Sequence, residues 1–191
     1  MRIGVVSDVH GNVDALRAAL DAMDGHIDEL WCAGDTVHEY RFSNEAVAFV
    51  RAHAAAVILG NHDMVLLSDA GAPARQRPGV DQDEVAWLGT MPLRHEVVLD
   101  GRRVLMVHGS PWEPHGDYVR PGNPKWRDAD QLGADIVVVG HTHEPMVERF
   151  GSTLVVNPGS LGEPRQRDDR RGSYAIIDTA AADAIIGRVE T

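Results

Sequence analysis

The sequence predicts an α/β fold in which a largely parallel β-sheet packs against a second, more antiparallel sheet. Short runs rich in valine and isoleucine recur along the chain, and helical patterns lie between several of them. Turn signals join further strand pairs in the C-terminal half. Strands that alternate with helices are typical of a parallel sheet, whereas tight turns join antiparallel strands.

Five apolar runs are the candidates for central strands. Each is too short for a helix. None has the alternating apolar and polar residues of a strand with one solvent-exposed face, so we expect burial on both faces. They span residues 3–6, 30–33, 56–59, 104–107 and 136–139.

Three helical patterns accompany these runs. The first has an apolar stripe at helical spacing over residues 13–23. The second starts at Ser43, an N-cap candidate, and the third starts at Asp81, where Glu84 completes a capping-box pattern.

The strand pairs follow from turn residues. Asp-Gly at 100–101 lies between two apolar runs and predicts a hairpin. Residues 146–157 and 173–190 have the same two-strand pattern. Residues 109–127 are rich in proline and glycine and predict a long ordered excursion rather than a linker.

Length and composition indicate one domain spanning residues 1–191 and disfavour several partners. The net charge of −11 argues against a nucleic-acid polymer or an anionic membrane as partner. No apolar run could span a bilayer, and the first apolar segment is too short for a signal peptide, so we expect a cytoplasmic protein. Cys32, the single cysteine, excludes a disulfide within the chain.

Metal-binding residue types follow every one of the five runs. Because ligands bind at the carboxyl ends of strands in open α/β sheets, we expect these side chains to converge. Each fragment alone would fit a capped turn or a solvated histidine, but five in succession point to a site. The residues are Asp8, His10, Asp35, Asn61, His62, Asp63, His108, His141 and His143.

Carboxylates and imidazoles without thiolate suit Mn, Fe, Zn, Co or Ni. The set exceeds what one ion needs, which predicts two divalent transition-metal ions. Pairs of such ions catalyse in-line attack on phosphorus, and Asp35 is the candidate bridging carboxylate.

Five motifs resemble those of the calcineurin-like metallophosphoesterases. They are D-x-H at 8–10, GD at 34–35, GNHD at 60–63, HG at 108–109 and GHTH at 140–143. HGSP at 108–111 and NPGSLGEPR at 157–165 resemble the small bacterial and archaeal phosphodiesterase branch. The resemblance covers nearly the whole chain and implies two mixed β-sheets packed as a sandwich flanked by helices, a four-layer αββα fold.

The resemblance also implies roles. Mn²⁺ is the expected metal, with Fe, Zn, Ni and Co as alternatives, and a metal-bridging hydroxide would attack the phosphodiester in line. His62 would be the general acid, oriented by Asp63, although His62 could instead only position phosphate. One ion would be held by Asp8, His10, Asp35 and His143, and the other by Asp35, Asn61, His108 and His141.

Substrate contacts are predicted at His38, close after Asp35, and at Arg165 and Arg167, whose guanidinium groups match phosphate oxygens. A mixed-charge surface loop is the alternative for the arginines. Aromatic residues within 109–127 would either line the pocket or only pack the loop.

Three functions remain open from the sequence. The leading one is a phosphodiesterase acting on a small or nucleotide-like phosphate ester. A phosphomonoesterase with the same metal site is the second, and a non-catalytic protein-binding scaffold is the third. The intact ligand set argues against the scaffold. The sequence does not predict the oligomeric state.

Overall fold

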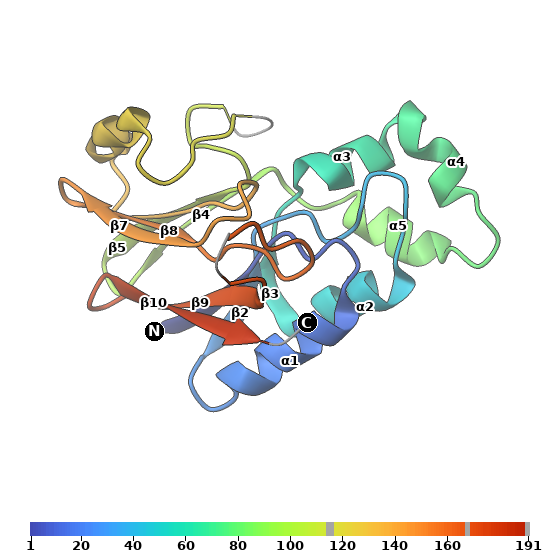
Figure 1. Cartoon of the computed structure of the whole chain (residues 1–191), viewed down its shortest axis with the longest axis horizontal. Helices are drawn as coiled ribbons and strands as arrows, with labels where there is room; N and C mark the ends of the chain where they lie inside the picture. Colours follow the sequence, from blue (N-terminus) through green and yellow to red (C-terminus); the bar gives the residue numbers. More distant parts are fainter. Residues whose placement is uncertain (114–116, 167–168, 190–191) are drawn as a thin grey trace.

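A computed structural model describes residues 1–113, 117–166 and 169–189. Figure 1 shows its helices and strands. In chain order these are β1 (Arg2–Val6), α1 (Val13–Met23), β2 (Glu29–Cys32), α2 (Asn44–His53), β3 (Ala54–Val57), α3 (Asn61–Leu67), η1 (Asp69–Gly71), α4 (Ala72–Arg75), α5 (Gln82–Leu88), β4 (Arg94–Leu99), β5 (Arg102–Val107), η2 (Pro124–Leu132), β6 (Ile136–Val138), β7 (Met146–Phe150), β8 (Thr153–Asn157), β9 (Gly172–Asp178) and β10 (Asp183–Val189).

The strands form two mixed five-stranded sheets, which confirms the predicted fold class. The first has the order β10-β9-β1-β2-β3, and the second β4-β5-β6-β8-β7. In the first sheet β1, β2 and β3 are parallel, and β9 is antiparallel to both of its neighbours, β1 and β10. In the second, β5, β6 and β8 are parallel and β4 and β7 are antiparallel edge strands.

The expectation of one largely parallel and one more antiparallel sheet was wrong. Each sheet has a parallel centre of three strands, and the C-terminal hairpin extends the first sheet instead of the second. Local periodicity identifies a strand but carries no information about its partner, because pairing is decided by contacts that are distant in sequence.

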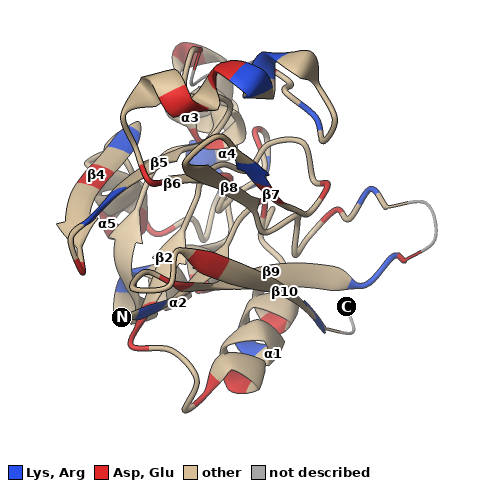
Figure 2. Cartoon of the chain, turned by 90° about the vertical axis from the view of Figure 1, so that its left-hand side faces the viewer, with Lys and Arg blue, Asp and Glu red and all other residues tan. Residues whose placement is uncertain are grey.

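The main core lies between the two sheets, which are stacked in Figures 1 and 2. Trp31, Ile136 and other fully buried side chains from both sheets fill it. Helix α1 packs on the outer face of the first sheet, where Leu16 is buried. The outer face of the second sheet is covered by η2, through Trp126.

The predicted local signals are present. Ser43 accepts a hydrogen bond from Ala46 N at 3.2 Å, and Asp81 accepts one from Asp83 N at 2.9 Å. Asp100 and Gly101, with φ of 49° and 76°, connect β4 to β5. Among the described residues, no helix is long and apolar enough to cross a membrane.

Candidate metal centre

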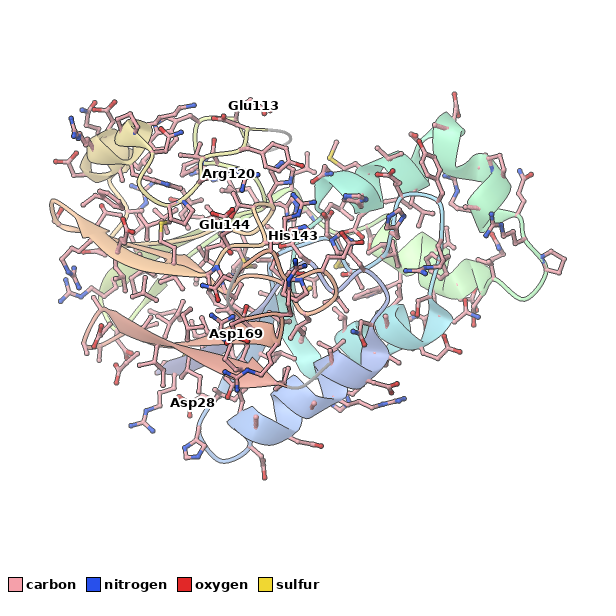
Figure 3. The ribbon with its side chains drawn as sticks, in the orientation of Figure 1. Asp28, Glu113, Arg120, His143, Glu144 and Asp169 are labelled. Carbon is pink, nitrogen blue, oxygen red and sulfur yellow. The ribbon has the colours of Figure 1, made fainter. Side chains whose placement is uncertain are left out.

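The carboxyl ends of strands from both sheets meet at one place, and two groups of potential metal ligands lie there. In each group the donor atoms lie within 4.8 Å of one another. Figure 3 shows His143 at this meeting point. The first group is Asp8, His10 and His143, and the second is Asp35, His108 and His141.

Two buried carboxylates each offer one free oxygen to these groups. Asp8 Oδ2 accepts hydrogen bonds from Ser7 Oγ at 2.6 Å and His141 N at 3.0 Å, and Asp35 Oδ1 accepts one from His62 N at 2.8 Å. The other oxygens, Asp8 Oδ1 and Asp35 Oδ2, lie 3.1 Å from His143 Nε2 and 3.2 Å from His108 Nε2 but form no hydrogen bond with any described residue. A buried carboxylate oxygen without a partner is costly, so these oxygens fit a bound cation.

Backbone carbonyls orient two of the histidines. His108 Nδ1 lies 2.8 Å from Ala33 O, and His143 Nδ1 lies 2.7 Å from Glu163 O. Donation from Nδ1 leaves each Nε2 free to bind metal, as in known metal sites. His10 Nε2 lies 3.3 Å from His143 Nε2, so both imidazoles point at one position.

Asn61 and Asp35 join the groups as predicted. Asn61 Oδ1 lies 3.1 Å from His108 Nε2, and Asp35 Oδ2 lies 3.2 Å from the same nitrogen. Asp35 also forms a group with His10 and His62. The structure therefore brings all seven predicted metal ligands together, with Asp35 between the two groups.

The backbone is left-handed at five of these seven positions. The φ angles of Asp8, His10, Asp35, His141 and His143 are between 50° and 65°. Such angles are uncommon outside glycine and concentrate at functional sites. After β6 the chain turns and sends the rings of His141 and His143 to different groups.

Two glycines allow the strand ends to approach. A Cβ at Gly60 would lie 2.1 Å from Asp35 Oδ1, and one at Gly140 would lie 2.1 Å from Ser7 Oγ. Neither distance is possible for a real side chain, so only glycine allows this packing.

The electrostatics of the centre favour positive charge. Burial disfavours the charged form of His108, but Asp35 and Asp8 outweigh it and raise the pKa of His108 to about 10. Burial likewise opposes ionisation of Asp8, yet His143 and His108 hold the pKa of that carboxyl below its usual range. Burial and the charge of His108 lower the pKa of His141 to about 4. The buried carboxylates of Asp8 and Asp35 thus favour positive charge in the centre, and the same charges would stabilise a bound cation.

The predicted contact of Asp63 with His62 is wrong. The Asp63 carboxylate accepts hydrogen bonds from Gly60 N at 3.0 Å and Val37 N at 3.0 Å, so it braces the start of α3. Burial and the charge of Asp35 raise the pKa of Asp63 to about 7. Glu39 takes the place expected of Asp63, because its Oε2 lies 2.8 Å from His62 Nδ1.

The predicted substrate residues lie at the rim of the centre. The ring of His38 is 5.1 Å from that of His62 and 6.0 Å from that of His10. Arg165 is exposed, and its amide donates to His143 O at 3.4 Å. Arg167 lies outside the described residues.

In the described part of residues 109–127, some side chains pack in the core of the protein and others lie beside the candidate metal centre. Trp126 is fully buried, with its ring 5.3 Å from that of Trp112. Tyr118 is half-exposed and covers His141, with ring centroids 3.8 Å apart. Arg120 forms an ion pair with Glu144, which anchors the segment beside the centre (Figure 3).

Two polar residues whose roles the sequence did not reveal position the metal loops. Asn157 Nδ2 donates to Gly140 O at 2.8 Å and to Thr142 Oγ1 at 3.0 Å, and it is buried. Ser160 Oγ donates to Asp8 O at 2.8 Å. Both belong to the NPGSLGEPR stretch, which marked the resemblance but predicted no contact.

Replacing Asn157 by Ala should therefore lower both stability and metal affinity. We expect a loss of about 1–3 kcal/mol in the free energy of unfolding, since buried polar groups lose their partners, and of about 10–100-fold in metal affinity. Denaturant unfolding and metal titration measure the two effects. Asn123→Ala, which removes an N-cap from η2, is the control, and equal metal affinity in both variants would contradict the positioning role.

The sandwich and its two donor groups define the class of protein as a metallophosphoesterase. The chain belongs to the calcineurin-like phosphoesterase superfamily, because the model of that domain matches residues 1–182.

Two of the three relatives that follow match nearly the whole chain, and the third matches half of it. A crystal structure of a metallophosphoesterase from Sphaerobacter thermophilus is 28% identical, with a TM-score of 0.79, and the match covers 100% of this chain and 88% of that one. An uncharacterised protein from Methanocaldococcus jannaschii is 29% identical over 98% of this chain and 87% of its own length. A symmetrical bis(5'-nucleosyl)-tetraphosphatase from Aromatoleum aromaticum is 38% identical, over 50% of this chain and 40% of that enzyme.

Proposed function

We propose that this chain is a dinuclear metal-dependent phosphodiesterase that hydrolyses a small or nucleotide-like phosphodiester. The observation that carries the proposal is the pair of adjacent donor groups with unpartnered buried carboxylate oxygens. The proposed ligands are Asp8, His10, Asp35 and His143 for the first ion, and Asp35, Asn61, His108 and His141 for the second.

Two divalent ions, with Mn²⁺ favoured, would supply activation of water and neutralisation of phosphoryl charge when bound. The chain supplies the proton for the leaving alkoxide. His62 is the proposed acid because its Nε2 faces the centre, 3.9 Å from Asp35 Oδ2, while Glu39 holds Nδ1 on the opposite side of the ring. The negative charge of Glu39 beside the far nitrogen attracts the ring and so favours this orientation of His62.

A cavity beside the centre has room for a nucleotide-sized substrate. A cavity of about 490 Å³ opens beside His10 and is lined by Arg41 and Phe42, among others. Arg41 places positive charge at this cavity, which Glu45 and Glu163 also line, and Arg165 lies close to His143. The name of the tetraphosphatase relative supports a nucleotide-like substrate.

Turnover of model substrates tests the proposal. Chelator-stripped protein should be inactive, and added Mn²⁺ should restore hydrolysis of bis-p-nitrophenyl phosphate at a higher rate than that of p-nitrophenyl phosphate. A preference for the monoester would replace the proposal with a phosphatase. Bound metal without turnover of either ester, with Mn²⁺, Ni²⁺, Co²⁺ or Zn²⁺, would favour the scaffold.

A further inference from the structure

A third donor group lies beside the paired groups. His38, Glu39 and His62 each place a donor atom within 4.8 Å of the others. We call these three residues the outer trio. Unlike the six residues of the paired groups, which are buried, they are partly exposed, with 20% of the His62 side chain and 30% of the Glu39 side chain accessible.

Two different elements hold the outer trio in place. His38 and Glu39 lie on a tight turn that is closed by hydrogen bonds between His38 and Arg41, at 3.0 and 3.3 Å. Arg41 also donates to His10 O at 3.3 Å. His62 lies in the first turn of α3, and its amide donates to Asp35 Oδ1. The three donors are thus arranged before any ligand binds, which reduces the cost of binding one.

The polar atoms of the trio are incompletely satisfied. His62 Nδ1 is buried and lies 2.8 Å from Glu39 Oε2, but the two atoms are not aligned for a hydrogen bond. A nitrogen and a carboxylate oxygen that face each other without alignment fit two ligands of one cation. Two imidazoles and a carboxylate suit Zn²⁺ and similar ions, and three protein ligands leave coordination positions open.

We propose that the outer trio binds an additional transition-metal ion and that its occupation inhibits hydrolysis. Inhibition rests on the proposed function, because the ion would engage Glu39 and the imidazole that donates the proton. The rings of His62 and His10 are only 4.8 Å apart, so ions in the inner groups would repel the additional one. Solvent exposure weakens binding further, and the trio should therefore fill only after the inner pair.

Metal stoichiometry tests the site independently of activity. Equilibrium dialysis against increasing Zn²⁺, followed by elemental analysis, should give two ions per chain and then a weaker third. His38→Ala should lose the third ion and keep two. His26→Ala, which removes an exposed imidazole outside the trio, should keep all three. A wild-type limit of two ions, or a third ion retained in His38→Ala, would overturn the site.

Folding and activity complete the test. Far-UV circular dichroism should match wild type for His38→Ala, and Glu39→Gln gives a second variant in which the third ion should be lost. Hydrolysis of a diester with an alkoxide leaving group, which needs the proton from His62, should fall over the Zn²⁺ range in which the third ion binds. In His38→Ala the rate, relative to the maximal rate of that variant, should fall only at a Zn²⁺ concentration at least about tenfold higher. Inhibition that is unchanged in His38→Ala would overturn the inhibitory role, whereas a third ion without any hydrolysis would overturn only the proposed function.

Discussion

Replacing Asp35 by Asn is expected to weaken both metal sites together. The Oδ2 atom of Asp35 lies 3.2 Å from His108 Nε2. The same carboxylate also lies within 4.8 Å of donor atoms of His10 and His62. Asparagine keeps an oxygen that can accept from the His62 amide, so the fold should survive. It lacks the negative charge that both ions require, and we expect each affinity to fall by at least about 100-fold.

The catalytic effect of this change should exceed that of other single substitutions. If both ions leave, kcat/KM should fall by at least about 10³-fold, since stabilisation of charge in the transition state is lost with them. Elemental analysis after dialysis measures the metal, and hydrolysis of bis-p-nitrophenyl phosphate measures activity.

A second aspartate provides the control. Asp135 precedes β6 at the end remote from the centre and accepts a hydrogen bond from Arg103 N at 2.8 Å. Asp135→Asn removes the same charge and should keep two ions per chain. If Asp35→Asn retained one ion at full affinity, Asp35 would serve a single site and the bridging role would be wrong.

The position of the candidate metal centre could be predicted from the sequence because the ends of the strands determine it. Runs such as 104–107 and 136–139 end directly in His108 and in the GHTH motif, and parallel strands align their carboxyl ends. This logic holds although the strands are divided between two sheets in an unexpected way. The strand ends of both sheets meet at one edge, so the error in the predicted strand partners did not change the predicted position of the site.

The contacts around His62 could not be predicted in the same way. Asp63 is adjacent in sequence, yet the first turn of α3 directs its carboxylate to the amides of Gly60 and Val37. Glu39 lies in an irregular loop without periodicity, 23 positions before His62, and only the tight turn at His38–Arg41 brings it there. Side-chain direction at a helix start depends on capping geometry, which a motif does not specify.

Replacing His62 by Ala should leave both inner ions bound but remove the proton donor. General acids contribute about 10²–10⁴-fold, and we expect a loss in kcat of this size for a diester with a poor leaving group such as an alkoxide. For bis-p-nitrophenyl phosphate the loss should be much smaller, because p-nitrophenolate departs without a proton. Equal losses on both substrates, or loss of metal, would make His62 a ligand or a structural residue.

Glu39→Gln extends this prediction to the residue that orients the acid. Glutamine keeps the size of the side chain but weakens its hold on His62 Nδ1, which is now 2.8 Å from a carboxylate oxygen. The loss in kcat should be smaller than for His62→Ala and should show the same dependence on leaving group, with both inner ions retained and KM little changed. Glu148→Gln, on an exposed position of β7, is the control. Because a misplaced acid and an absent acid fail at the same step, adding Glu39→Gln to His62→Ala should cost almost nothing further. Additive losses would show that Glu39 acts elsewhere.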